Sequence, residues 1–287
     1  MIVRDICMSE SVKISEEIPG DAKIVILAGR GQYPVICAKN IKRYGFDFTV
    51  IAVDDEVDKA WLQSLPRDKV YFVPSGHLGK LLKILKKISA THIIMAGQVK
   101  PKKLFHGMFP DWKALSVLAK LKERNAETIF GAIVHEIESI GANVIDARSF
   151  MWDQLAESGH IVDCGAILGQ DDIDFGIKIA REIARLNIGQ SVVIRKGTVV
   201  AVEDFAGTDE MIRRVGNFGI SGAVFVKVAK HNQDFRFDVP VFGVTTVENL
   251  SNSNINFAVL ESQKTLLLDK SNVISIAKEL GISIIGF

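Results

Sequence analysis

The stretch from Lys23 to Pro34, KIVILAGRGQYP, indicates the fold of the first half of the chain. Residues 24–28 are all apolar, which is typical of a strand buried on both faces of a parallel sheet. Two glycines follow at positions 29 and 31, and Pro34 suits the first turn of a helix. A strand, a glycine-rich turn and a helix in this order predict the first unit of a Rossmann-like sheet.

The same unit recurs through the first half of the chain. Apolar runs predict further strands at 48–53, 70–73 and 92–96, and helical spacing of apolar residues predicts helices at 35–44, at 81–88 and, as a pair, between 112 and 141. Repeated strand–loop–helix units favour a parallel sheet with right-handed crossovers.

The second half has a different order of predicted strands and helices. Lys196-Gly197 lies between two apolar runs and predicts a hairpin of 191–195 with 198–203. Further strands are expected at 223–228, 241–244, 256–260 and 265–268, with helices at 171–187, 208–215 and 273–280. We therefore predict an α/β protein in three parts, which are an N-terminal extension (1–21), a Rossmann-like parallel sheet domain (22–155) and a mixed α/β catalytic domain (156–287).

The composition is that of an ordinary globular protein, with 48% hydrophobic and 24% charged residues in a chain of 287. The 35 Lys and Arg residues nearly balance the 34 Asp and Glu residues, and a net charge of +1 argues against a nucleic-acid partner. The three cysteines lie far apart without a CxxC pair, so we expect neither a disulfide framework nor a thiolate zinc site. A reducing, cytoplasmic location is the simplest prediction.

Glycines and lysines follow the ends of the predicted strands in the first half. Ligands of open α/β sheets bind beyond the carboxyl ends of the strands, where backbone N–H groups and helix N-termini attract anions. We predict a phosphate-binding rim here, and its members are Gly29, Gly31, Gly79, Lys80, Gly97 and Lys100. A nicotinamide dinucleotide site is the alternative, with Asp54 or Asp55 at the ribose, although Pro34 replaces the third glycine of that fingerprint.

Lys100, Lys102 and Lys103 precede a run rich in bulky apolar residues at 104–112. Basic residues beside large apolar ones suit contact with a lipid substrate or peripheral contact with a membrane surface. The alternative is a loop that folds its aromatic side chains inward.

The densest group of charged residues lies between Lys227 and Pro240, KVAKHNQDFRFDVP. Asp234, Arg236 and Asp238 are two residues apart, so in an extended strand they would share one face, with the intervening phenylalanines turned toward the core. Carboxylate oxygens suit Mg²⁺, and the basic side chains suit phosphate. A ladder of salt bridges on an exposed strand explains the pattern equally well, and the residues alone favour neither.

A second acidic cluster, EDFAGTDE, starts at Glu203 in an expected strand-to-helix loop. Gly207 would give a ligand access to the backbone, Thr208 would cap the helix, and Asp209 would add a carboxylate to a metal site. Helix capping alone is the alternative.

Several segments together resemble one family, the bacterial UDP-2,3-diacylglucosamine pyrophosphatases of the LpxI type. The segments are Ala28 to Pro34, Gly79-Lys80, Ala96 to Pro101, Asp111 with the helix after it, Asn187 to Val193, Val202 to Asp209, and Lys227 to Pro240. The resemblance runs from about residue 23 to the C-terminus. The ordered set is specific, whereas each glycine motif by itself is weak.

The resemblance implies an enzyme that hydrolyses UDP-2,3-diacylglucosamine to 2,3-diacylglucosamine 1-phosphate and UMP, a step in lipid A synthesis. It also implies a divalent metal, Mg²⁺ or Mn²⁺, and a homodimer. Residue chemistry and resemblance together assign catalysis to Lys227, Lys230, Asp234, Arg236 and Asp238, metal binding to Asp209, Asp234 and Asp238, and further substrate contacts to Gly207, Thr208 and Gln233.

Two positions depart from the family pattern. Asn125-Ala126-Glu127 stands where the family often has Gly-Asp-Asp, and Arg30 occupies a position that is usually small. Two other functions stay open as alternatives: a nucleotide-sugar-binding protein without catalysis and an NAD(P)-dependent oxidoreductase. Peripheral contact with the inner membrane is a further expectation.

Overall fold

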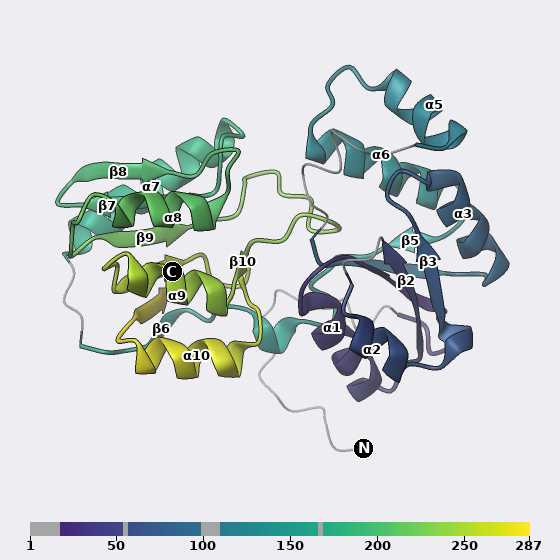
Figure 1. The fold of residues 1–287 in the computed structure, drawn as a ribbon, viewed down its shortest axis with the longest axis horizontal. Helices are drawn as coiled ribbons and strands as arrows, with labels where there is room; N and C mark the ends of the chain where they lie inside the picture. Colours follow the sequence, from purple (N-terminus) through teal and green to yellow (C-terminus); the bar gives the residue numbers. More distant parts are fainter. Residues whose placement is uncertain (1–17, 54–56, 99–109, 166–168) are drawn as a thin grey trace. The chain divides into compact units, whose positions relative to one another are not determined.

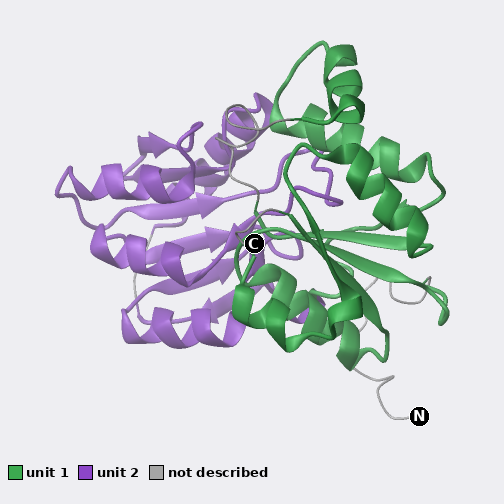
Figure 2. Cartoon of the chain, turned by 45° about the vertical axis from the view of Figure 1, so that its right-hand side comes forward, with its two compact units in different colours: residues 1–151 green, residues 152–287 purple. Residues whose placement is uncertain are grey.

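The computed structural model describes residues 18–53, 57–98, 110–165 and 169–287. The chain divides into two compact units, residues 1–151 and 152–287, and each is one continuous stretch of chain (Figure 2). The predicted α/β class is confirmed, with a parallel sheet in the first unit and a separate mixed sheet in the second.

The first unit is built around a parallel sheet (Figure 1). Its elements are β1 (Ile24–Ala28), α1 (Tyr33–Arg43), β2 (Phe48–Val53), α2 (Lys59–Ser64), η2 (Arg67–Lys69), β3 (Val70–Val73), α3 (Leu78–Lys87), β4 (His92–Ala96), α5 (Trp112–Lys120), α6 (Ala126–Glu138) and β5 (Asn143–Val144). The described strands have the order β3-β2-β1-β4-β5. Every residue of the central strand β1 is buried, which explains its wholly apolar sequence.

The second unit contains a mixed sheet and a small additional sheet. Its elements are η3 (Trp152–Gln154), β6 (Gly159–Val162), α7 (Gln170–Arg185), β7 (Ser191–Arg195), β8 (Thr198–Val202), α8 (Thr208–Gly216), β9 (Val224–Lys227), β10 (Val241–Phe242), α9 (Val244–Asn252), β11 (Phe257–Leu260), β12 (Leu266–Leu267), α10 (Lys270–Glu279) and β13 (Ser283–Gly286). The main sheet, as described, has the order β6-β13-β11-β9-β7-β8, and β10 pairs with β12.

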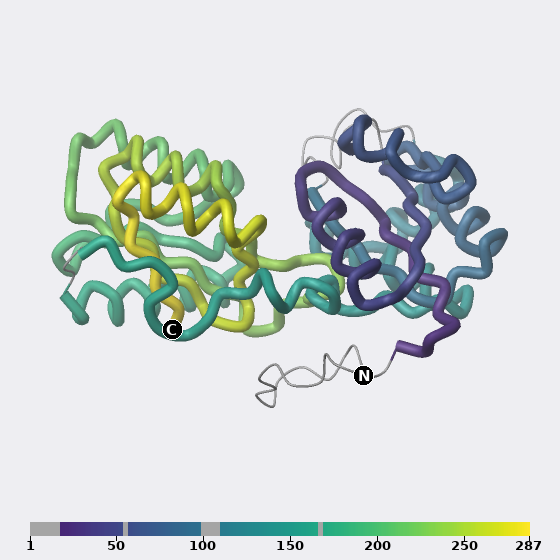
Figure 3. Tube along the Cα trace, turned by 90° about the horizontal axis from the view of Figure 1, so that it is seen from below, coloured from purple at the N-terminus to yellow at the C-terminus, as the bar shows by residue number. Residues whose placement is uncertain are grey.

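Helices cover both faces of the main sheet in the second unit (Figure 3). On one face, side chains of α7 such as Ile173 and Ala180 pack on Val192 and Val226. On the other, α8, α9 and α10 pack on alternate residues of the same strands, among them Phe225. This alternation follows from the period of two along a strand, and it leaves both faces of β7, β9 and β11 buried.

Helix α9 was not predicted from the sequence. Its residues, VTTVENLSN, include several β-branched residues and asparagines, which have modest helix propensity. The strand expected at 241–244 is present as β10 at 241–242 and overlaps the helix only at Val244. Val247 and Leu250 lie one turn apart and are fully buried. Tertiary packing of these two side chains thus outweighs the local preference.

Within the described residues, no helix combines the length and the apolar composition needed to cross a membrane.

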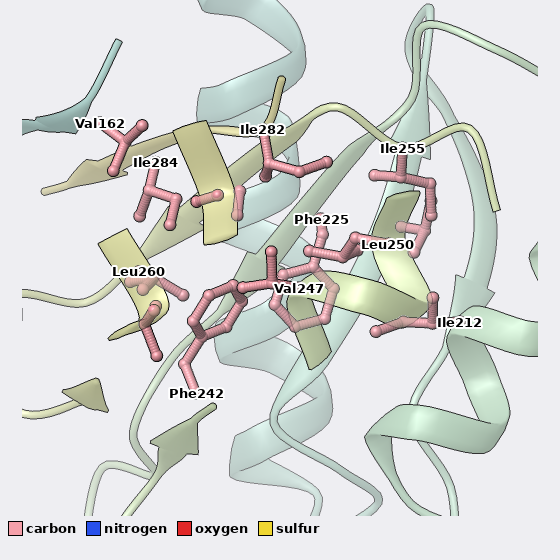
Figure 4. Packing of buried hydrophobic residues seen from close by; sticks show 14 of the residues in the cluster. Val162, Ile212, Phe225, Phe242, Val247, Leu250, Ile255, Leu260, Ile282 and Ile284 are labelled. Atoms are coloured by element: carbon pink, nitrogen blue, oxygen red, sulfur yellow. The ribbon is translucent and has the colours of Figure 1, made fainter. Parts of the chain in front are cut away.

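We predict that Phe225→Ala lowers the free energy of unfolding of the second unit by about 3–5 kcal/mol. Phe225 is fully buried beside Phe242, with ring centroids 6.0 Å apart, and truncation leaves a cavity among well-packed neighbours (Figure 4). Urea denaturation followed by circular dichroism measures the effect. Phe218→Ala, at a side chain that is 60% exposed, is the matched control and should change the value by about 0.5 kcal/mol or less. Equal effects of the two substitutions would contradict the prediction.

Candidate active site

Four strands of the second sheet bring polar residues to one edge. β9 is parallel to β11, and β7 is antiparallel to both β8 and β9, so β8, β9 and β11 end at the edge where β7 begins. Glu203 follows β8, Lys227 ends β9, Glu261 follows β11 and Ser191 begins β7. Ligands of α/β sheets bind beyond such carboxyl ends, which makes this edge the candidate site of the second unit.

Lys227, Thr208, Glu203 and Ser191 form a continuous series of hydrogen bonds at this edge, which we call the Lys227–Glu203 network. Lys227 Nζ donates to Thr208 Oγ1 at 3.0 Å, and Thr208 Oγ1 donates to Glu203 Oε1 at 2.8 Å. Ser191 Oγ donates to Glu203 Oε2, and the backbone N–H of Gln190 reaches the same oxygen at 3.2 Å. Both oxygens of the carboxylate are therefore held.

The network is largely withdrawn from water. Lys227 is only 6% exposed, and Ser191 is fully buried. Burial acts to raise the pKa of Glu203, but the charge of Lys227 and the hydrogen bonds from Ser191, Thr208 and Gln190 outweigh it and hold the pKa below its ordinary value. Glu203 is thus ionised at neutral pH and balances the charge of Lys227.

Two glycines fit the backbone around the network. A Cβ at Gly189 would overlap the carbonyl oxygen of Glu203, so glycine is required for this close approach. Gly207, with a φ of +89°, occupies the N-cap position of α8 and makes no side-chain cap. The predicted capping role of Thr208 is therefore wrong, because Thr208 is already the first residue of the helix and its hydroxyl bonds Lys227 and Glu203.

The loop after β9 turns back on itself, so the predicted extended strand is wrong. The carbonyl of Asp234 accepts hydrogen bonds from the N–H groups of Phe237 at 3.2 Å and Asp238 at 2.9 Å. The Asp234 side chain also accepts the N–H of Arg236 at 3.1 Å, a local bond of the kind that competes with extended structure. Both phenylalanines of the loop are only partly buried.

The charged side chains of this loop pair with one another. Arg236 spans the carboxylate of Asp234, with Nε 2.9 Å from Oδ1 and Nη2 2.7 Å from Oδ2, and thereby lowers the pKa of Asp234. Lys230 Nζ lies 3.5 Å from Asp238 Oδ2. Gln233 accepts the backbone N–H of Lys230 and donates to the carbonyl of Asp238, both at 2.7 Å. The structure thus brings these five predicted site residues into one loop and shows salt bridges within it.

The three predicted metal ligands do not form a ready-made cluster. Among residues 18–53, 57–98, 110–165 and 169–287, no three His, Cys, Asp or Glu side chains gather closely enough to hold an ion. Asp209 instead accepts a hydrogen bond from Thr246 at 3.3 Å. The loop carboxylates Asp234 and Asp238 fit Mg²⁺ only in the way that is usual for this ion, with phosphate oxygens and water as the other ligands.

Two glycines of the predicted phosphate rim in the first unit serve close backbone packing. Arg30 and Gln98 form a β-bridge just beyond β1 and β4. A Cβ at Gly29 would lie 2.6 Å from the carbonyl oxygen of Gln98, and one at Gly97 would lie 2.8 Å from that of Arg30. These contacts explain both glycines without an anion. Gly31 differs, because its φ of +98° requires glycine while the space around it is open.

The N-terminus of α3 is occupied by Asp111. Its Oδ2 accepts the backbone N–H groups of Gly79 at 2.7 Å and Lys80 at 3.3 Å, and its Oδ1 caps α5 through the N–H of Ala114 at 2.9 Å. The backbone N–H groups of Gly79 and Lys80 therefore bond a carboxylate of the protein, and the predicted substrate contacts of these two residues stay predictions.

Other predicted positions of the first unit lie outside the described residues. They are Asp54, Asp55, Lys100, Lys102, Lys103 and 104–109. Asn125, which departs from the family pattern, has a local role, since its side chain accepts the N–H of Thr128 at 2.9 Å in a capping box at the start of α6.

Sequence reasoning missed Ser191 and Gln190 and gave Glu203 no specific role. Ser191 opens an apolar strand, and the family segment Asn187 to Val193 that contains it gave it no chemical role. One signal was present in the sequence: Glu203 and Lys227 each stand at the end of a predicted strand. Residues in such positions meet at one edge when their strands run in the same direction.

These observations define an α/β protein of two compact units, with a charged and hydrogen-bonded site at the carboxyl edge of the second sheet. The chain belongs to the LpxI family, since the model of the LpxI N-terminal domain matches residues 23–154 and that of the LpxI C-terminal domain matches residues 167–285. It is 30% identical over 276 residues to the UDP-2,3-diacylglucosamine pyrophosphatase LpxI of Caulobacter vibrioides, a match that covers 92% of this chain and 97% of the relative. The resemblance noted from the sequence is confirmed.

We predict that Glu203 stabilises the fold at neutral pH and that acid removes this contribution. Because its pKa is lower in the folded protein than in the unfolded chain, the stabilisation is present above the ordinary Glu pKa and is lost as pH falls through the folded-state pKa. Glu203→Gln should therefore cost about 1.5–3 kcal/mol at pH 7, the usual worth of hydrogen bonds to a charged group, and progressively less as pH falls below the ordinary Glu pKa of about 4.3. Urea denaturation at pH 7 and at a series of acidic pH values measures the difference, and a pH-independent cost would contradict the prediction.

Proposed function

We propose that this protein hydrolyses the diphosphate bond of UDP-2,3-diacylglucosamine to 2,3-diacylglucosamine 1-phosphate and UMP, in lipid A synthesis. The observation that carries the proposal is the similarity to a relative named for this pyrophosphatase activity, which extends over nearly the whole of both chains. The cationic groups at the carboxyl edge of the second sheet support it, because a diphosphate ester is an anion.

In the proposed reaction, the oxygen of a water molecule bonds to one phosphorus atom and the bond from that phosphorus to the bridging oxygen breaks. The bridging oxygen leaves with the second phosphate and carries the negative charge. Lys227 at the strand end, with Lys230 and Arg236 in the next loop, would stabilise the charge that develops on the phosphoryl oxygens and the leaving group. Gln233 shapes this loop through its two backbone hydrogen bonds.

Asp234 is the carboxylate that we place nearest to the chemistry. Hydrogen bonds from Arg236 lower its pKa, so it is ionised at neutral pH. An ionised carboxylate can accept a hydrogen bond from the attacking water and orient it, or take its proton as a general base. Asp238, which lies beside Lys230, is the second carboxylate of the same loop.

We further propose that the reaction requires a divalent cation, Mg²⁺ or Mn²⁺. Asp234 and Asp238 would hold it together with the diphosphate oxygens of the substrate. When bound, the cation would polarise a phosphoryl oxygen and screen its charge. The homodimer that the resemblance implies, the cytoplasmic location expected from the cysteines and peripheral contact with the inner membrane all stay predictions.

We predict that Asp234→Asn lowers kcat for UMP release by about 10²–10⁴-fold while the protein stays folded. The amide keeps the size of the side chain but removes the charge and the basic oxygen. The assay is chromatographic measurement of UMP from UDP-2,3-diacylglucosamine, with circular dichroism to verify folding.

Asp174→Asn is the matched control, because Asp174 lies on α7 and hydrogen-bonds only Gln170 among the contacts seen for it in the described structure. It should release UMP at the wild-type rate. Wild-type turnover by Asp234→Asn would refute the assignment of Asp234. A wild-type protein that binds the substrate without releasing UMP would favour the nucleotide-sugar-binding alternative.

We predict that EDTA abolishes UMP release and that excess Mg²⁺ or Mn²⁺ restores it. The carboxylates and the diphosphate repel one another unless a cation lies between them. The measurement is the initial rate in metal-free buffer titrated with each cation. Unchanged turnover in EDTA would show that the reaction proceeds without a dissociable divalent metal.

A further inference from the structure

The hydroxyl of Thr208 both accepts and donates a hydrogen bond within the network. A lysine ammonium can only donate hydrogen bonds and an ionised carboxylate can only accept them. Thr208 must therefore accept from Lys227, at 3.0 Å, and give its single proton to Glu203, at 2.8 Å. In this arrangement its proton is used within the protein, and the predicted substrate contact of Thr208 stays a prediction. This hydroxyl links the lysine to the carboxylate.

The carboxylate of Glu203 is held in place by hydrogen bonds and packing, so it can fix the position of Thr208 and, through it, of Lys227. Its second oxygen accepts from the buried hydroxyl of Ser191 and from the backbone N–H of Gln190. On the backbone side, Gly189 packs so closely against Glu203 that a Cβ would lie 2.8 Å from the Glu203 Cβ. The carboxylate thus has few alternative positions.

The geometry points to Glu203 as the positioning residue for Lys227, an inference that rests on the proposed function. Acting through Thr208, Glu203 fixes the direction of the Lys227 ammonium at the end of β9 and compensates its charge where water is largely excluded. Lys227 can then present its remaining N–H groups to a phosphoryl oxygen of the substrate. Glu203 itself need not touch the substrate.

Other carboxylates on the elements around β9 have partners of their own. Asp209 on α8 accepts a hydrogen bond from α9, and Glu261 after β11 lies 2.8 Å from Lys264. In the loop after β9, Asp234 is spanned by Arg236. The network links the negative charge of Glu203 to the buried ammonium through Thr208, and the neutral hydroxyl of Ser191 on β7 lies beside it.

The test compares Glu203→Gln with Glu182→Gln, which removes the same charge from an exposed ion pair on α7. For each protein we would measure the pH profile of kcat/KM for UMP release. The titration of the Lys227 ammonium would be followed by NMR of ¹³C-labelled lysine, assigned by the signal that disappears in Lys227→Met. Loss of the nearby negative charge destabilises the ammonium, so Glu203→Gln should move both the NMR titration of Lys227 and the alkaline limb of kcat/KM to lower pH. Glu182→Gln should match wild type.

A double mutant separates action through Lys227 from a general structural role. Glu203→Gln should lower kcat/KM when Lys227 is present and should have little further effect on Lys227→Met, because the group that Glu203 positions is then gone. Equal effects in both backgrounds would overturn the inference. An unchanged Lys227 titration in folded Glu203→Gln would also overturn it.

Ser191→Ala serves if Glu203→Gln does not fold. It removes one hydrogen bond from Glu203 but keeps the charge, so kcat/KM should fall about 2–10-fold, the value of one hydrogen bond, while the alkaline limb stays in place. Wild-type kcat/KM in Ser191→Ala would overturn the inference. If the wild-type protein releases no UMP, the proposed function fails, and the Lys227 titration, which needs no substrate, still decides whether Glu203 controls the ammonium.

Discussion

The second unit depends on one requirement, that a charge buried at the end of a strand must find its partner within the protein. Lys227 is at the end of β9 and is almost fully buried, which is costly for an isolated ammonium. Thr208 and Glu203 meet this cost through two hydrogen bonds and an opposite charge. The site is therefore polar and ordered before any substrate arrives, which is the condition for effective electrostatic stabilisation of a reacting anion.

Glycines and helix N-termini have different roles in the two units. In the first unit, Asp111 caps the N-termini of both α3 and α5, and close packing between backbones accounts for Gly29 and Gly97. In the second, the N-terminus of α8 lacks a side-chain cap and lies beside Lys227. A glycine or a helix N-terminus therefore indicates an anion site only when neighbouring side chains leave its N–H groups available.

Much of the candidate site could be predicted from the sequence, because a dense group of charged residues can be recognised without the structure. Lys227, Asp234, Arg236 and Asp238 were all named from their density in one segment. The conformation of this segment was not accessible from the sequence, because an extended strand and a turn both place these residues within reach of each other. The side chain of Asp234 decides between the two by bonding a backbone N–H two residues on.

The sequence by itself determined most strands and helices of both units, since continuous apolar runs and helical spacing report burial directly, but it did not predict α2, β5, β6, α9 or β13. It also determined the family, through an ordered set of short segments. Only the tertiary structure decided that Ser191, Glu203, Thr208 and Lys227 act together. They belong to or directly follow four different elements, and they meet because β8 and β9 run in one direction while β7 runs in the other. The Lys196-Gly197 turn indicates that β7 and β8 are antiparallel, but the pairing of β9 with β7 depends on how the sheet assembles, and no local pattern encodes it.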